Sequence, residues 1–365
     1  MKKLLYCLVW TVALLASAQA LHAQKIQVVD SDGMPIAYVC VTNENGVLVG
    51  NTDVEGILAD AKGTPVLYLS HIAFQDKAVN LGDIVDGRIV MEEIDFSLPD
   101  VEVKPKELAY TQTYYRLIYF DEEGPIYFRG GVIDNTYEFA NKKVNSKKRS
   151  LAKGKSGLIR FLISTIVGRY IDDMGKVEEK SLYNKVIERE KAGKLIISDE
   201  KDGRRTVSDS ICVLGYIDTD MNRLERTTSF NGWLYQDHIK EAEARAKGKK
   251  LKEKDKVAND EESFFEVYRI DEEGRSRIDD FVMRQLYVSG AHSRSEGNYV
   301  ILMQAYTTKR DYIDKKEFKQ TRNENKVEMN ILEFKQFEQA NGIPPMAPNI
   351  QTQVDKLFEK ELNKK

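Results

Sequence analysis

The sequence predicts a mainly β, α+β protein, in which a small N-terminal β-sandwich is followed by a larger antiparallel-sheet domain with a few helices. Short apolar-alternating runs recur at roughly ten-residue spacing over residues 25–105, with no helical pattern between them. Longer strand-like runs continue beyond residue 109 and are interrupted by a few helical patterns. The 18 tyrosines and 14 phenylalanines suit half-buried antiparallel strands.

The N-terminus has the pattern of a secretory signal peptide. Two lysines precede a nearly unbroken apolar run over residues 4–15, and small residues follow as far as Ala20. Cleavage after Ala20 or Ala23 would remove at most residues 1–23, and an uncleaved N-terminal anchor is the alternative. No later run holds about 18 consecutive apolar residues, so we expect a periplasmic or extracellular chain with no transmembrane span after cleavage.

Charge and cysteine content narrow the class of protein. The net charge is -3, and loss of Lys2 and Lys3 with the signal would make it more acidic, which argues against a nucleic-acid-binding protein. Beyond the signal only Cys40 and Cys212 remain. They are far apart in sequence, so we expect two separate buried thiols, with a disulfide as the alternative that an exported protein allows.

Residues 24–105 are expected to form the sandwich. Turn residues separate its strands at Ser31–Pro35, Asn43–Gly46 and Thr52–Gly56. The expected strands are Lys25–Asp30, Ile36–Thr42, Val47–Gly50 and Pro65–Ser70, with more around Ala78 and Ile89.

An ordered set of residues in this segment carries a resemblance. The set is Val29–Asp30, Gly33–Ile36, Ala37, Val39, Gly46, Gly50, Thr52–Asp53, Gly56, Leu67 and Leu69–Ile72. It resembles the carboxypeptidase regulatory-like domain, a transthyretin-like β-sandwich common in exported proteins of Bacteroidetes. The sequence departs from that family at Ala73–Phe74, where Gly-Tyr is usual, and at Ile57, where an aromatic is frequent. The resemblance implies an accessory module that holds no catalytic residues of its own.

Residues 106–365 are expected to form the larger α+β domain. Its strands are expected at Tyr114–Phe120, from Ile126, at Leu195–Ser198, Arg205–Val213 and Val267–Ile270, towards Phe281, and at Asn298–Tyr306 and Lys326–Phe334. Two Asp-Glu-Glu-Gly turns recur, at Asp121–Gly124 and Asp271–Gly274, which two similar hairpins explain. Helical spacing predicts an apolar helix at 158–171, a charged helix at 237–252 and a C-terminal helix at 349–362.

This layout is loosely similar to lipoprotein-carrier and related lipid-binding domains, in which a curved sheet holds an apolar cavity. In that case the helix at 158–171 would lie over the cavity, with Tyr115, Tyr127 and Tyr306 in its lining. The alternative is a filled core beneath the same helix.

Complete catalytic motifs are absent from the sequence. His238 and Glu241 have the spacing of a zinc pair, but only His71 and His292 remain to supply a third ligand, so His238 is expected to be a surface residue. Gly154-Lys155-Ser156 resembles the end of a phosphate-binding loop. Such a loop needs a second glycine five residues before Gly154, and Arg149 occupies that position.

Ser295 lies near Gly297, but Ser293 stands where a nucleophile elbow requires glycine, and nothing supports His292 as its base. We therefore nominate no catalytic, cofactor-binding or metal-binding residue and expect no cofactor. The basic run from Lys142 to Lys155 is expected to be a solvated loop, with contact to a polyanion or anionic lipid as the alternative.

Two functional classes follow. The first is a non-catalytic exported cell-envelope protein that binds a lipid, a glycan or a partner protein and carries the sandwich as an accessory module. The alternative is a hydrolase with a carboxylate-based active site in residues 106–365, whose members cannot be chosen among 58 acidic residues. A boundary between separable units is expected near Lys104–Lys106, because Pro105 cannot extend a central strand.

Overall fold

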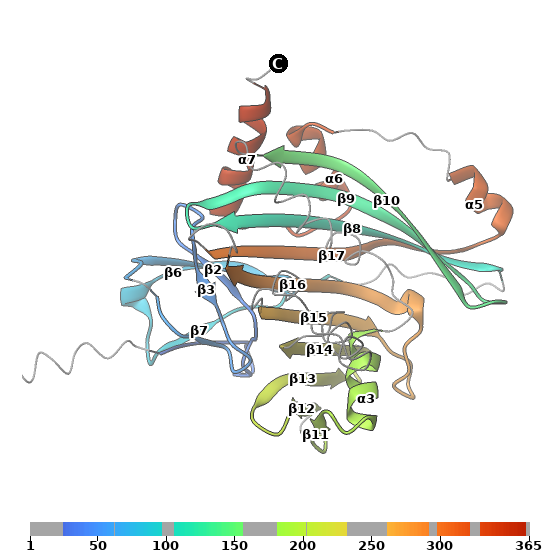
Figure 1. Cartoon of the computed structure of the whole chain (residues 1–365), viewed down its shortest axis with the longest axis horizontal. Helices are drawn as coiled ribbons and strands as arrows, with labels where there is room; N and C mark the ends of the chain where they lie inside the picture. The colour runs from blue at the N-terminus through green and yellow to red at the C-terminus, as the bar shows by residue number, and fades with distance from the viewer. Residues whose placement is uncertain are drawn as a thin grey trace, which may run out of the picture.

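The chain combines a small two-sheet unit with one large antiparallel sheet, as the sequence predicted (Figure 1). A computed structural model describes residues 25–61, 63–96, 106–155, 181–201, 203–231, 261–291, 298–321 and 329–362. The signal segment 1–23, the expected helices at 158–171 and 237–252, His238, and the Ser293–Gly297 segment with His292 lie outside these residues.

The N-terminal unit is a sandwich of a three-stranded and a four-stranded sheet. The first has the order β4-β1-β7 and the second the order β3-β2-β5-β6. The strands are β1 (Ile26–Val29), β2 (Cys40–Thr42), β3 (Leu48–Asn51), β4 (Ile57–Leu58), β5 (Val66–His71), β6 (Phe74–Asn80) and β7 (Arg88–Val90). A 3-10 turn, Leu81–Asp83, follows β6. Alternating apolar side chains from both sheets, among them Val28, Val41 and Leu69, fill a core of its own.

One expected strand is shorter than predicted. Residues 36–42 were expected to be extended throughout, but β2 begins only at Cys40. Tyr38 has φ 62°, in the left-handed region that non-glycine residues seldom adopt, so the pleat cannot continue through it. This backbone conformation directs the Tyr38 side chain away from the sandwich core and towards the large sheet, where its hydroxyl contacts Leu214.

A single turn design recurs four times, after Asp30, Asn43, Asp53 and Asp271. In each, the first side chain accepts hydrogen bonds from the backbone N–H groups two and four residues on, at 2.8–3.1 Å. The glycine at the fourth position has φ between 72° and 79°, a conformation that costs glycine little. The Asp121 turn has the same four residues as the Asp271 turn but keeps only the first of these bonds, with Gly124 at φ 123°. The sequence echo is therefore not an exact structural one.

The large sheet has ten strands in the order β10-β9-β8-β17-β16-β15-β14-β13-β12-β11, all antiparallel. The strands are β8 (Leu108–Asp121), β9 (Gly124–Glu138), β10 (Lys143–Lys155), β11 (Ile196–Ile197), β12 (Arg204–Ser208), β13 (Val213–Asp220), β14 (Glu225–Asn231), β15 (Glu261–Arg269), β16 (Phe281–Ala291) and β17 (Asn298–Ile313). A 3-10 turn, Ile278–Asp280, precedes β16. The last strand, β17, lies between β8 and β16 and so joins the first hairpins to the rest.

Different elements pack against the two faces of this sheet. The sandwich, α6 (Ile331–Ala340) and α7 (Pro348–Leu362) pack on one face, and α3 (Leu182–Lys191) packs on the other (Figure 1). Because side chains alternate along a strand, Tyr115 and Tyr127 belong to the α3 face and Tyr306 to the opposite one. The expectation that these three tyrosines line one cavity is therefore wrong.

The observed helices agree only in part with those predicted from the sequence. The C-terminal helix expected at 349–362 is confirmed as α7, but the strand expected at Lys326–Phe334 is wrong, because α6 begins at Ile331. Asn330 caps α6 by accepting hydrogen bonds from the Leu332 and Glu333 backbone N–H groups, at 3.0 Å each. Two further helices, α3 and α5 (Lys315–Thr321), were not anticipated.

The basic run was expected to be a loop, and this is also wrong. Residues 143–155 form β10, which pairs with β9 along its whole length at the edge of the sheet. Lysines are common on edge strands, where they discourage pairing with other chains.

The two cysteines are separate and free, but only Cys40 is buried, since Cys212 is exposed. Within the part of the chain described here, no helix is long and apolar enough to cross a membrane.

Candidate ligand-binding cleft

The sandwich and strands β12–β16 enclose a cleft of about 1540 Å³. The sandwich contributes its β1–β2 turn, the start of β6 and the segment after β7. The volume of the cleft is above the range of about 300–1,000 Å³ that is typical of small-molecule sites. The cleft is the candidate functional site of the described chain.

Three cross-strand rows form the floor. The first runs Tyr216–Ser229–Phe265, the second Arg204–Asp218–Thr227–Val267–Met283, and the third Asp220–Glu225–Arg269. Residues directly opposite each other in a sheet share a face, so each row presents its side chains to the same space. The rows are polar over β12–β14 and mainly apolar over β15 and β16.

Contacts on several sides of the cleft fix the sandwich against the sheet. The Tyr38 hydroxyl donates to the Leu214 carbonyl oxygen at 3.2 Å. Gln285 donates to the Tyr38 carbonyl oxygen at 3.2 Å, and the Ile72 backbone N–H donates to Gln285 at 3.1 Å. An ion pair joins Arg223 to Glu93. The left-handed turn at Tyr38 thus positions one wall of the cleft.

Arg204 and Tyr216 form a stacked pair at the outer end, over β12 and β13. The guanidinium lies 4.5 Å from the Tyr216 ring centroid and makes a two-point ion pair with Asp218. Asp30 of the sandwich faces this pair, and burial raises the pKa of its carboxyl, against the effect of Arg204 and of its turn hydrogen bonds. This end of the cleft therefore holds its arginine in a fixed orientation.

The third row contains a carboxyl, that of Glu225, whose pKa is raised. Burial raises the pKa of Glu225, and the carboxylates of Asp220 and Glu93 act in the same direction, against Arg223 and Arg269. A half-buried carboxyl beside other carboxylates in a cleft is a feature that functional sites often have.

Another cluster borders the cleft near the 3-10 turn before β16. Arg310 bonds Asp279 at 2.9 Å and Asp280 at 2.6 Å, and Arg277 bonds Asp279. The Tyr312 hydroxyl donates to Asp279 at 2.7 Å. Burial alone would raise the pKa of Asp279, but these donors lower it. The charged groups of this cluster are therefore paired with one another.

A buried polar network, whose residues do not line the cleft, runs across three strands on one face of the sheet. Arg116 donates to Gln304 at 2.7 Å, and Gln304 donates to Gln285 at 3.0 Å. Arg116 also donates to the Pro344 carbonyl oxygen at 2.8 Å and lies 3.6 Å from Glu338 of α6. The three strand residues form one cross-strand row on β8, β17 and β16. The network therefore links α6 and the segment after it to the sandwich, across the strands of the face that all of them cover.

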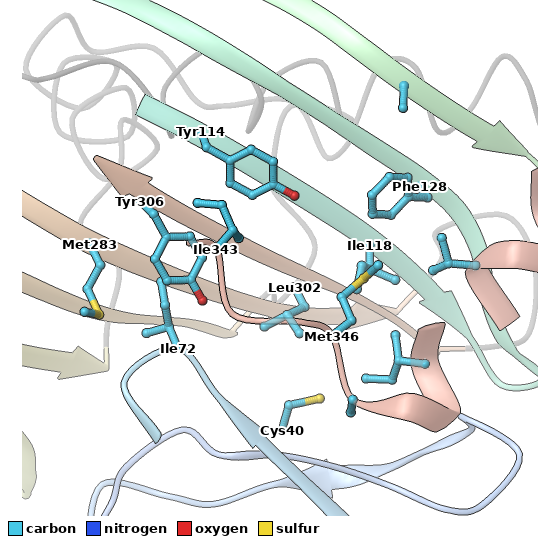
Figure 2. Close-up of a cluster of buried hydrophobic side chains, with 14 of the residues drawn as sticks. Cys40, Ile72, Tyr114, Ile118, Phe128, Met283, Leu302, Tyr306, Ile343 and Met346 are labelled. Atoms are coloured by element: carbon cyan, nitrogen blue, oxygen red, sulfur yellow. The ribbon is translucent and has the colours of Figure 1, made fainter. Parts of the chain in front are cut away.

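Apolar side chains surround this network. Figure 2 shows Cys40 and Ile72 of the sandwich, Tyr114 and Tyr306 of the sheet, and Met346 of the segment after α6 converging on one cluster. Burial raises the pKa of the Cys40 thiol to about 12, so it stays protonated and unreactive at neutral pH.

His71 lies directly behind the apolar part of the cleft. Its ring packs edge-on to Phe265 at 4.5 Å and against Phe74 at 5.3 Å, and both of these residues line the cleft. Nδ1 accepts a hydrogen bond from the Ala73 backbone N–H at 3.2 Å. Burial lowers the pKa of His71 to about 3, so the ring is neutral.

The motifs weighed from sequence do not meet in this cleft. Gly154 lies in β10 beneath α7, where an added Cβ would be 3.0 Å from Leu357 and Phe358. Close helix packing, not phosphate binding, accounts for that glycine. Among the residues that the structure describes, no three or more His, Cys, Asp or Glu side chains are grouped as a metal site would require.

Sequence reasoning missed the cleft residues because they come from many separate segments between Asp30 and Arg310. The available signal was the alternation in β13 and β14, where Tyr216, Asp218 and Asp220, then Glu225, Thr227 and Ser229, point to one face. No family model and no curated protein matches this chain.

Proposed function

We propose that this chain is a non-catalytic exported cell-envelope protein that binds a ligand in the cleft between the sandwich and the large sheet. The observation that carries the proposal is the cleft itself: about 1540 Å³, with ordered polar and apolar rows on its floor. Its size suits a chain-like ligand better than a small metabolite. The sandwich supplies one wall of the site, so in this proposal it takes part in binding.

The export and family assignments are parts of the same proposal. Export rests on the signal-like pattern of residues 1–23. The resemblance to the carboxypeptidase regulatory-like domain is supported by two facing sheets of three and four strands with a common core. The module's accessory role in that family agrees with a site in which it contributes a wall.

Native mass spectrometry of the mature chain, purified from the cells that make it, tests the binding proposal. Thr227 lies in the middle of the floor between Asp218 and Val267, so the indole of Thr227→Trp should obstruct the middle of the site. We expect a bound ligand in the wild type, its loss in Thr227→Trp, and its retention in the matched control Thr352→Trp on the exposed face of α7. A wild-type chain free of ligand, or a ligand that Thr227→Trp retains, would contradict the proposal.

One observation favours the second candidate, a carboxylate-based hydrolase. Glu225, whose pKa is raised by burial, stands opposite Asp220 on the neighbouring strand, and hydrolases of glycosidic bonds use a proton-donating acid beside a second carboxylate. Asp220, however, accepts hydrogen bonds from the turn N–H groups of Asn222 and Arg223 at 2.8 and 3.1 Å. A panel of nitrophenyl glycosides tests this candidate: turnover abolished by Glu225→Gln would establish it in place of the binding role.

A further inference from the structure

The polarity of the cleft changes in one direction across the sheet. Over β13 and β14 the floor presents Asp218, Asp220, Glu225 and the hydroxyl of Thr227. Over β15 and β16 it presents apolar side chains, namely Phe265, Val267 and Met283, with Arg269 as the exception. A ligand lying across the strands would meet a charged region at one end and an apolar region at the other.

The sandwich wall follows the same direction. Asp30 faces Arg204 at the outer end of the cleft. Phe74 packs with His71, which in turn meets Phe265 of β15. Further in, the Phe96 ring lies 5.0 Å from that of Tyr306 on β17. Aromatic side chains therefore lie at the β15–β17 end of the cleft, beside the paired charges of Asp280 and Arg310, whereas the β12–β13 end has Asp30 beside the Arg204–Asp218 pair.

The charge of the lining has a definite sign. Of the residues that the structure describes, ten carboxylates and five arginines line the cleft, and no lysine or histidine among them does. Three arginines are paired with lining carboxylates, Arg204 with Asp218, Arg223 with Glu93, and Arg310 with Asp280, which leaves the excess of carboxylates unchanged. A concave site of one predominant sign attracts ligands of the opposite charge.

We propose that the cleft binds a cationic amphiphile: a molecule with a positively charged amine at one end, held over β12–β14, and an apolar chain at the other, held over β15 and β16 against Phe74 and Phe96. This inference rests on the proposed binding function and names the chemistry of its ligand. The positively charged amine compensates the negative charge of the carboxylates on the floor. The apolar chain covers the apolar part of the floor and removes it from water.

Isothermal titration calorimetry of the full mature chain with three twelve-carbon probes tests the inference. Dodecylammonium, dodecanoate and dodecyl maltoside share the apolar chain and differ only in the head group; each is used below its micelle concentration at an ionic strength of about 0.15 M. We expect dodecylammonium to bind at least about tenfold more tightly than the other two. Hexylammonium, with half the chain length, should bind at least about 100-fold more weakly than dodecylammonium.

Two variants locate the amine end. Glu225→Gln should reduce the preference for dodecylammonium over dodecyl maltoside by about threefold or more, whereas Glu359→Gln, an exposed site on α7, should leave it unchanged. Circular dichroism confirms that both variants stay folded.

The outcomes separate this inference from the function on which it rests. Equal or tighter binding of dodecanoate or dodecyl maltoside, or a preference untouched by Glu225→Gln, overturns the cationic amphiphile while leaving a binding protein. The same holds if no probe binds but native mass spectrometry finds a ligand that Thr227→Trp releases. Failure of both experiments overturns the binding function as well.

Discussion

Burial of a neutral histidine should make this protein lose stability as the pH falls from 7 to 5. His71 is fully enclosed by apolar and aromatic neighbours, and this lowers its pKa from 6.5 to about 3. In the unfolded chain the imidazole binds a proton near its ordinary pKa, so below pH 6.5 the unfolded state holds more protons than the folded state. The stabilisation is therefore complete above the unfolded pKa and is lost as the pH falls towards the folded value.

The size of the effect follows from these two pKa values. Between pH 7 and pH 5, protonation of the unfolded histidine lowers the free energy of unfolding by about 2 kcal/mol. His71→Asn removes the titrating group and retains an oxygen that can accept the hydrogen bond from the Ala73 N–H. Urea denaturation of both proteins at pH 7, 6 and 5 should show that the wild type loses about 2 kcal/mol more than the variant.

Comparing the two proteins cancels other groups that titrate in the same interval. An identical loss of unfolding free energy in wild type and His71→Asn would refute the reasoning, because it would mean that His71 is protonated in the folded protein. A lower starting stability for the variant at pH 7 does not affect the test, since only the change with pH is compared.

Three further predictions concern the units, the packing and metal content. The fragment 24–105 should fold alone with β-type circular dichroism, because it has its own core; an unfolded fragment beside a folded full chain would disprove this. Gly130→Ala should lower the free energy of unfolding by about 1–3 kcal/mol, since a Cβ there would lie 2.1 Å from the Phe334 ring of α6, whereas Gly82→Ala, with open space around it, should not. Elemental analysis of the purified mature protein should find no stoichiometric zinc, and one zinc per chain that His238→Ala removes would contradict this.

Local signals determined the architecture. Alternation at a period of two, turns that end in glycine, and tyrosine-rich runs were enough to predict a small sandwich followed by a larger antiparallel sheet. The four turns beginning at Asp30, Asn43, Asp53 and Asp271 depend only on residues within five positions of one another. The helix at 349–362 was visible for the same reason, because its apolar stripe is a local pattern.

Elements whose identity depends on distant partners were mispredicted. The basic segment at 143–155 looked like a loop because its lysines hide the pattern, yet β9 supplies a pairing partner along its length. Residues 331–334 were predicted to be extended although Asn330 and Glu333 form a capping box, a local helix signal that was overlooked; the distant contact is that of Phe334 with Gly130. Ile36–Val39 looked like strand, but the left-handed Tyr38 turns its side chain to Leu214, far along the chain.

The sequence by itself determined the fold class, the turn chemistry and the scarcity of histidine and cysteine, because composition and short-range spacing contain that information. Only the tertiary structure decided the candidate site. The cleft exists because three contacts dock the sandwich on the sheet. They are the hydrogen bonds of Tyr38 with Leu214 and of Ile72 with Gln285, and the ion pair of Glu93 with Arg223. Strand register then brings Asp218, Thr227 and Val267 into one row. Register and docking are set by pairings between residues tens to hundreds of positions apart, which no local pattern specifies.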